Sequence, residues 1–168
     1  MIPMLESMFA HMAWADDAIL AAVAGQEGAY ADEEIRKLLH HIVTVQRFFF
    51  SLMQTRSTED DWKKPAPETL DEMRRLFAEA HADGAAYTAR LDDAELARTI
   101  QFPIMKEFQP PVRDALVQVA MHSEHHRAQV AARLRALGPN RRSLTTSCGC
   151  AWARVPRHSA PASANSLS

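Results

Sequence analysis

The chain has 168 residues, of which 47% are hydrophobic and 24% charged, and its formal net charge is -2. A chain of this length and composition can bury one core without disulfides or a structural metal, which predicts a single domain. The nearly balanced charge excludes a strongly basic binder, so neither nucleic acid nor a membrane surface is an expected partner. The first twenty residues lack the basic region and apolar run of a targeting segment, so a cytoplasmic location is expected.

Clusters of glycine and proline divide residues 1–138 into four long segments that each carry apolar residues at helical spacing. The first segment ends at the "GQEG" cluster, and the second follows it as far as about Leu52. The third runs from about Glu68 to Leu91, and the fourth runs from about Pro111 to Leu137. Four amphipathic helices of this kind predict an all-α fold, a four-helix bundle.

Two helix boundaries carry recognisable capping residues. Thr69 stands before the third segment with Glu72 three residues later, which is the pattern of a capping box. Gly138 followed by Pro139 predicts the end of the fourth helix. The connections before the third and fourth segments are long for a bundle, which favours longer crossings or small flaps at these places.

The second segment contains two adjacent histidines, which a helical wheel separates. The wheel places His41 toward the apolar stripe of this helix and His40 on the outer face. Phe49 is expected to face inward with His41, whereas Phe50 is not. The predicted stripe consists of Leu38, Ile42, Val45, Phe49 and Leu52.

The fourth segment contains "MHSEHHRAQV", residues 121–130, with three histidines in five positions. His122 and His126 differ by about 40° on the wheel, so both rings can reach one point in the bundle interior. His125 falls on the polar side, which predicts a solvent-facing or supporting position. Besides the first two histidines, the interior stripe is expected to hold Val112, Ala115, Val119, Val130, Leu134 and Leu137.

Three inward histidines, His41, His122 and His126, have two interpretations. Each imidazole could form its own hydrogen bond with a carbonyl or carboxylate in the core. Alternatively, one divalent metal ion could bind all three imidazoles at once. Neutral imidazole suits zinc, nickel, cobalt or iron, and three protein ligands leave a position open for water or substrate. A di-iron bundle is disfavoured because the stripes lack the paired Glu-x-x-His motifs that such sites need.

The fourth segment resembles the HxxHHRxQ signature of the DinB-like superfamily of bacterial four-helix proteins. The second segment, "LLHHIVTVQRFFF", looks like that family's second motif, and "LESMFAHMAWADDAIL" looks like its first helix with the characteristic tryptophan. The resemblance covers the chain as far as about residue 138 and implies an up-down-down-up bundle. It also implies that the metal ligands are His41, His122 and His126.

The same signature contains His125, Arg127 and Gln129, which the resemblance suggests as residues that orient the ligands or the substrate. Because Arg127 and Gln129 flank the predicted stripe, a solvated surface position is the alternative for both.

The resemblance implies a metal-dependent enzyme, a thiol S-transferase or a hydrolase that acts on a small electrophile. The expected partners are a low-molecular-weight thiol, the electrophile and a second copy of the chain in a homodimer. Zinc or nickel is the expected metal, with iron, cobalt or manganese as alternatives. The competing interpretation is a non-catalytic metal-binding protein of the stress response.

Residues 139–168 form a tail rich in serine, alanine, proline and arginine and without a single acid, a composition typical of disorder. The second interpretation is out-of-frame translation: one allowed set of codons for "LTTSCGC" reads in a shifted frame as Asp-Tyr-Ile-Val-Trp-Leu, which resembles the segment found there in relatives. In that case Cys148, Cys150 and Trp152 have no functional meaning. The two cysteines form no disulfide framework or zinc-finger spacing in either case.

Overall fold

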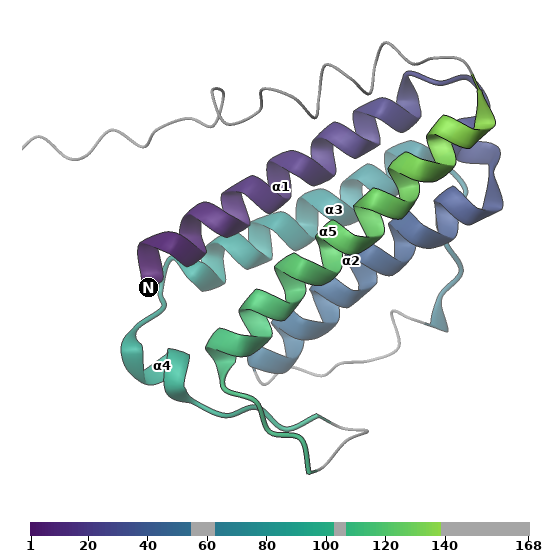
Figure 1. Ribbon diagram of the computed structural model, residues 1–168. Coiled ribbons are helices and arrows are strands. Elements are labelled where there is room, and N and C mark those ends of the chain that lie inside the picture. The colour runs from purple at the N-terminus through teal and green to yellow at the C-terminus, as the bar shows by residue number, and fades with distance from the viewer. Residues whose placement is uncertain (55–62, 103–106, 139–168) are drawn as a thin grey trace, which may run out of the picture.

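Four long helices lie side by side in a computed structural model that describes residues 1–54, 63–102 and 107–138 (Figure 1). They are α1 (Ile2–Ala24), α2 (Glu33–Met53), α3 (Leu70–Thr88) and α5 (Val112–Leu137). A short 3-10 helix, η1 (Ala29–Ala31), joins α1 to α2, and a five-residue helix, α4 (Asp93–Ala97), follows α3. The described residues contain no strand, only one isolated β-bridge between Thr99 and Pro111. The predicted all-α bundle is confirmed.

The helices follow an up-down-down-up order, which can be traced in Figure 1. Contacts between helix ends agree with it. The amide of Gln26, just after α1, donates to the carbonyl of Leu134 near the end of α5, so these two helices run parallel. Arg133 of α5 binds Asp32 at the start of α2, so these two run antiparallel. Each helix packs against two neighbours: α2 contacts α3 and α5, and α1 contacts α3 and α5.

Helix boundaries follow the local chemistry of the sequence. The predicted capping box is present: the Thr69 hydroxyl accepts from the backbone N–H of Glu72, whose carboxylate accepts from the backbone N–H of Thr69. Gly138 is the C-cap of α5, as predicted. At the start of α2, the Asp32 carboxylate accepts from the backbone N–H of Ile35. The same carboxylate binds Arg133, so one residue both caps α2 and ties it to α5.

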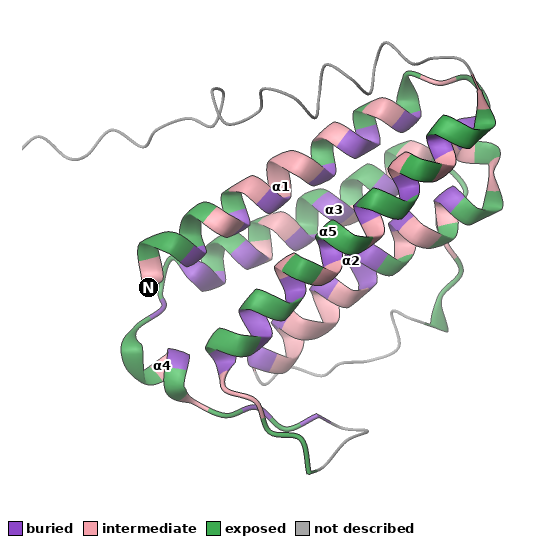
Figure 2. Cartoon of the chain, viewed as in Figure 1, coloured by how far each residue is buried: buried purple, intermediate pink, exposed green. Residues whose placement is uncertain are grey.

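The buried side chains form two apolar clusters along the bundle (Figure 2). One occupies the end near α4, where Leu96, Ile100 and Phe102 from the connection close the core. The other occupies the end near η1. Between them lies a layer of buried polar side chains, one or two from each of three helices, namely Asp16, Gln46, Ser123 and Arg127. We call this set the polar layer.

The predicted apolar stripe of α2 was wrong in its orientation. Phe50 is 1% exposed and belongs to the core, whereas Phe49 is only partly buried. The residues that face the core are Ile35, Leu39, Ile42, Val43, Gln46, Phe50 and Met53. The wheel failed because α2 carries two apolar faces: Leu38, Phe49 and Leu52 are partly buried at the edge of the bundle, and a polar glutamine interrupts the true core row.

The predicted stripe of α5 needs a similar correction. Leu137 is 40% exposed, and the core positions between Val119 and Val130 belong to Ser123 and Arg127 instead of His122 and His126. The remaining core residues of this helix, Val112, Ala115, Leu116 and Leu134, are apolar. The proposed tail, residues 139–168, lies outside the described residues. Within the described part of the chain, no helix combines the length and apolar character needed to span a membrane.

Candidate metal centre

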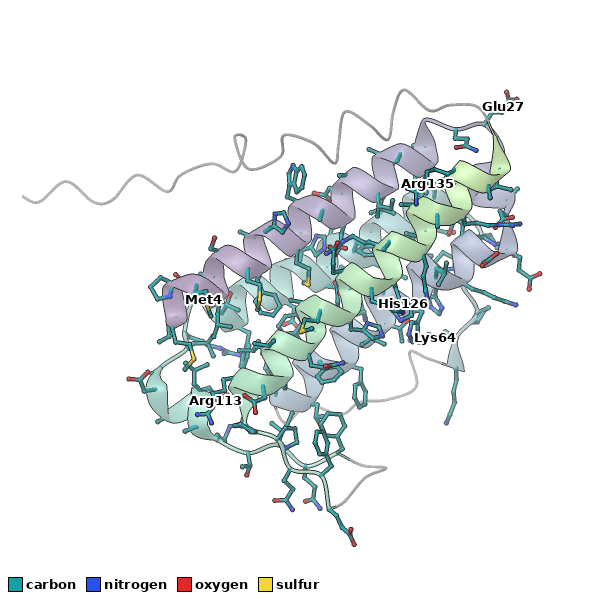
Figure 3. All side chains as sticks on the ribbon, viewed as in Figure 1. Met4, Glu27, Lys64, Arg113, His126 and Arg135 are labelled. Atoms are coloured by element: carbon teal, nitrogen blue, oxygen red, sulfur yellow. The ribbon has the colours of Figure 1, made fainter. Side chains whose placement is uncertain are left out.

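Three histidines from two antiparallel helices meet at the edge of the bundle, His41 from α2 and His122 and His126 from α5. One ring nitrogen of each lies within 4.8 Å of the others. The Nε2 atoms of His41 and His122 are 3.1 Å apart, and the rings of His41 and His126 have centroids 4.6 Å apart. Figure 3 labels His126 on the side of α5 that borders α2. We call these three residues the histidine cluster.

The spacing of the cluster suits a divalent metal ion. Two nitrogen ligands about 2.0–2.1 Å from a tetrahedral zinc ion are separated by about 3.3 Å. The observed 3.1 Å between the Nε2 atoms of His41 and His122 is close to that separation, and a ring nitrogen of His126 lies within 4.8 Å of the ligand atoms of both. Neutral imidazole is a preferred ligand for zinc, nickel, cobalt and iron. The donor set and its geometry therefore fit one such ion, with a coordination position left open.

Gln129 fixes the protonation of His126. Its side-chain oxygen can only accept, so the 2.7 Å contact with Nδ1 of His126 places a proton on that nitrogen. In the neutral form of this ring the lone pair is then on Nε2, the nitrogen left available to a metal ion. The amide of Gln129 in turn donates to Nε2 of His125 at 3.1 Å. The predicted supporting position of His125 and Gln129 agrees with these contacts, and both residues are exposed.

The surroundings lower the pKa of two residues of the cluster, His41 and His122. Partial burial, followed by the neighbouring rings of His126, His41 and His125, lowers the pKa of His122 to about 4. Although His41 is exposed, the protein atoms around its ring displace part of its water, and this is the main reason why its pKa is lowered, with smaller contributions from His126 and His40. Neutral rings present lone pairs to a metal ion without competition from protons. The electrostatic state of the cluster therefore favours metal binding near pH 7.

The cluster does not lie where the helical wheel predicted. His41 is exposed, and His122 and His126 are half-buried, so the three rings line the outer edge between α2 and α5 instead of the bundle interior. The interior at this level is occupied by the polar layer. The three rings still converge, as predicted, because the side of α2 that carries His41 and the side of α5 that carries His122 and His126 lie next to each other. A site at the edge is reachable from solvent.

The polar layer lies directly behind the cluster. Asp16 of α1 is fully buried, and its carboxylate accepts from Arg127 at 2.6 Å and from Gln46 at 2.7 Å. The same carboxylate is 3.0 Å from Nε2 of His81 on α3. Gln46 also donates to Ser123 at 3.1 Å. Ser123 and Arg127 each follow a cluster histidine by one residue, so these bonds fix the rotation of α5 and with it the direction of His122 and His126.

Arg127 is therefore not the solvated surface residue that one of the two alternatives drawn from the sequence predicted. The other alternative, a residue that orients the ligands, stays a prediction. Arg127 is 7% exposed and bridges Asp16 and Glu124. Sequence reasoning missed Asp16 and Gln46 altogether. Each interrupts an otherwise apolar core row, Asp16 between Met12 and Ile19 and Gln46 between Val43 and Phe50. Polar residues at core spacing on two helices were the signal that could have revealed the layer.

Comparison with known families supports the resemblance found in the sequence. A family model described as the DinB superfamily matches residues 33–130, more than half of the 168-residue chain. The matched region contains all three residues of the histidine cluster. The chain matches no curated protein and no solved structure.

Proposed function

Because the chain belongs to the DinB superfamily, whose members are generally metal-binding, we propose that it binds one divalent metal ion through His41, His122 and His126. The observation that carries this proposal is the convergence of three imidazole nitrogens within 4.8 Å at a solvent-accessible edge. Zinc and nickel are the ions we expect first, since both accept neutral imidazole in open three-histidine sites.

We propose further that the protein is an enzyme, a thiol-dependent S-transferase or a hydrolase acting on a small electrophile. A divalent ion at the cluster would lower the pKa of a bound thiol or water and so supply a nucleophile at neutral pH. Partial burial lowers the pKa of His122 and His41, the Gln129 contact directs Nδ1 of His126 away from the cluster, and the cluster is open on the solvent side.

A non-catalytic metal-binding role is the second candidate, and one observation favours it. Among the described residues, the hydrogen-bonding contacts of the cluster are with histidine and glutamine side chains, and the cluster contains no carboxylate that could act as a general base. Turnover of an electrophile in the presence of a thiol would separate the two candidates.

The proposal is tested by the metal content of tag-free protein, measured by elemental mass spectrometry after purification and after dialysis against zinc. We expect about one equivalent of divalent metal in the wild type, since the three nitrogens form one site. A His41→Ala variant and a His122→Ala, His126→Ala double variant should lose it. Three-ligand sites that lose a ligand bind metal far more weakly, and even changes to supporting residues cost about 10- to 100-fold in affinity.

A matched control comes from the adjacent residue. His40→Ala removes the same kind of side chain from the same helix, one position away, and should keep the full metal content. If the wild type binds no metal, or if His40→Ala loses as much metal as His41→Ala, the proposed site is wrong.

A further inference from the structure

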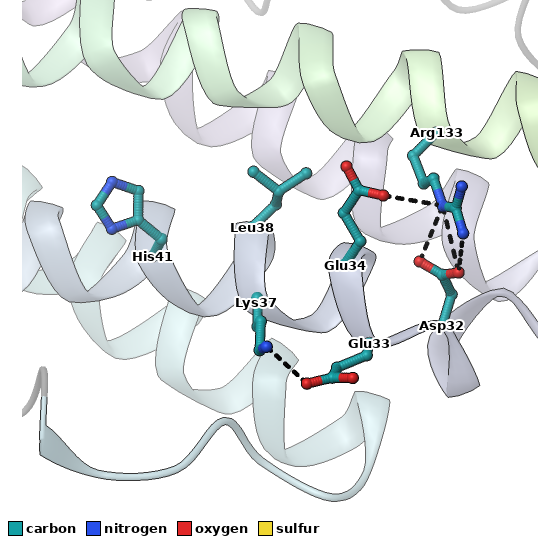
Figure 4. Close-up of a pocket in the computed structure, with 7 residues that line it drawn as sticks. All are labelled: Asp32, Glu33, Glu34, Lys37, Leu38, His41 and Arg133. Atoms are coloured by element: carbon teal, nitrogen blue, oxygen red, sulfur yellow. Dashed lines mark hydrogen bonds and ion pairs between the residues drawn. The ribbon is translucent and has the colours of Figure 1, made fainter.

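A pocket of about 570 Å³ begins at His41 and continues along α2 toward the end of α5 (Figure 4). Its volume is in the range of sites for small organic ligands. Apart from His41, the pocket is lined by Leu38, Asp32, Glu33, Glu34, Lys37 and Arg133. One end of the pocket therefore touches the histidine cluster, and the other end is densely charged.

The two helices bring the charged end into register with the cluster. Glu34 precedes His41 by seven residues on α2, and Arg133 follows His126 by seven residues on α5. Seven residues are about two helical turns, or about 10 Å along the axis. Since α2 and α5 are antiparallel, the two displacements point the same way, and Glu34 and Arg133 indeed meet at 3.2 Å. The charged end lies about 10 Å from the cluster.

Some charges of the pocket are committed to the fold. Asp32 caps α2 and binds Arg133 through both oxygens, at 2.7 to 3.2 Å. These bonds to Arg133 are the main reason why the pKa of Asp32 is lowered. Asp32 and Arg133 therefore form the fixed wall between α2 and α5.

The other charges are available to a ligand. Lys37 and Glu33 form an ion pair at 2.6 Å, but their side chains are 71% and 70% exposed. An ion pair between such exposed side chains contributes little to stability, so either partner can exchange it for a ligand group. Glu34 has a side chain 61% exposed. The pocket thus offers an ammonium group and carboxylates, and the apolar side chain of Leu38 lies between Glu34 and His41 (Figure 4).

We propose that this pocket binds the zwitterionic amino-acid end of a ligand whose other end reaches the histidine cluster. The ammonium group of the ligand pairs with Glu34, its carboxylate pairs with Lys37, and the connecting atoms lie over Leu38. Because both signs of charge are accessible in one pocket, a zwitterion satisfies them together, whereas a simple anion or cation leaves one sign unpaired. The inference rests on the proposed metal site, which supplies the anchor for the thiol end.

The test is calorimetric titration of the zinc-loaded full chain with two probes. Glutathione carries a thiol and, several bonds away, an amino-acid end. N-acetylcysteinylglycine keeps the thiol and replaces the γ-glutamyl group by acetyl. We expect glutathione to bind about 10-fold more tightly or better, since each charged contact in a partly exposed site contributes modestly. A Glu34→Gln, Lys37→Ala double variant should lose that advantage and bind both probes equally.

Matched controls use exposed charges elsewhere, Glu6→Gln on α1 and Arg113→Ala at the start of α5, which should leave both affinities unchanged. Equal affinity of the two probes for the wild type, no binding of glutathione, or an unchanged preference in the double variant would each overturn the pocket assignment. Retention of zinc in those same samples would leave the proposed metal site standing, whereas loss of zinc binding in the wild type would overturn the metal site itself.

Discussion

Asp16 is the residue whose environment departs furthest from that of an ordinary charged side chain. It is fully buried, yet it accepts two hydrogen bonds, from Arg127 and Gln46, and lies 3.0 Å from His81. Burial of a carboxylate is costly unless the charge is paired and its oxygens are hydrogen-bonded, and here both conditions are met. One residue of α1 thereby connects all four long helices.

Replacing Asp16 by Asn should destabilise the protein strongly. The substitution keeps the shape but removes the charge, so Arg127 loses its buried counter-charge and keeps only the exposed carboxylate of Glu124. Loss of one partner from a buried pair costs about 3–5 kcal/mol. The free energy of unfolding, measured in urea, should fall by about 3 kcal/mol. Asp17→Asn is the control: this neighbour is exposed, and its substitution should change stability by no more than about 0.5 kcal/mol. Equal effects of the two substitutions would contradict this account.

At the scale of helices, α2 determines how the site is built, because one of its faces packs in the core and another carries residues of the pocket and the cluster. Its core row packs against α1, α3 and α5 through residues such as Phe50. Its outer edge carries Glu34 and His41, and with them the charged pocket and the cluster. The rotation of α2 about its own axis therefore decides both the packing of the core and the direction of His41.

The packing of α2 on α3 depends on a glycine. A Cβ atom at Gly84 would lie 2.7 Å from Cζ of Phe50, whose ring is enclosed by Phe9 and Tyr87. Gly84→Ala should gain about 1 kcal/mol of helix propensity but cost about 1–3 kcal/mol through overpacking. We expect a net loss in the free energy of unfolding, measured with guanidinium chloride.

The contact with Phe50 can be isolated by a second substitution. Phe50→Leu destabilises by itself, but it removes the ring atoms that the new methyl group would meet. The double variant Gly84→Ala, Phe50→Leu should therefore lose less stability than the sum of the two single variants. If the changes in the free energy of unfolding are strictly additive, the new methyl group at position 84 does not overlap sterically with the ring of Phe50.

At the scale of the whole molecule, the histidine cluster links the stability of the metal-free bundle to pH. In the folded protein the pKa of His122 is lowered to about 4, and in the unfolded chain it is about 6.5. Between these values the unfolded chain binds a proton that the folded protein does not. The contribution of this histidine is therefore fully present above about pH 6.5 and is lost as the pH falls toward 4.

Chelator-treated protein should accordingly show a free energy of unfolding that decreases from pH 6.5 to pH 4. Carboxylates with lowered pKa values, such as Asp32 and Glu95, add to the loss at the acidic end, so the wild type is compared with His122→Gln. The variant keeps these carboxylates and lacks the titrating ring, and its pH dependence should be shallower in this window. Identical slopes for the two proteins would refute the assignment to His122.

Local sequence patterns determined several features of this protein by themselves. Helical periodicity and the glycine and proline clusters predicted four long helices, and the capping residues at Thr69 and Gly138 marked two of their boundaries. The spacing of His122 and His126 placed them on one side of their helix. These predictions succeeded because they depend on angles and hydrogen bonds within one segment, which the local sequence dictates.

Only the tertiary structure decided which side of each helix faces the core. The periodicity of α2 allowed two apolar faces, and the choice between them came from contacts between helices: Gln46 with Asp16 and Ser123, and Gly84 with Phe50. The charged pocket could not be predicted from the sequence either, because Asp32 and Arg133, which meet in its wall, are 101 residues apart in the chain. A periodic pattern gives the angles between side chains of one helix, but the rotation of that helix against its neighbours is set by packing and by the pairing of buried polar groups across the bundle.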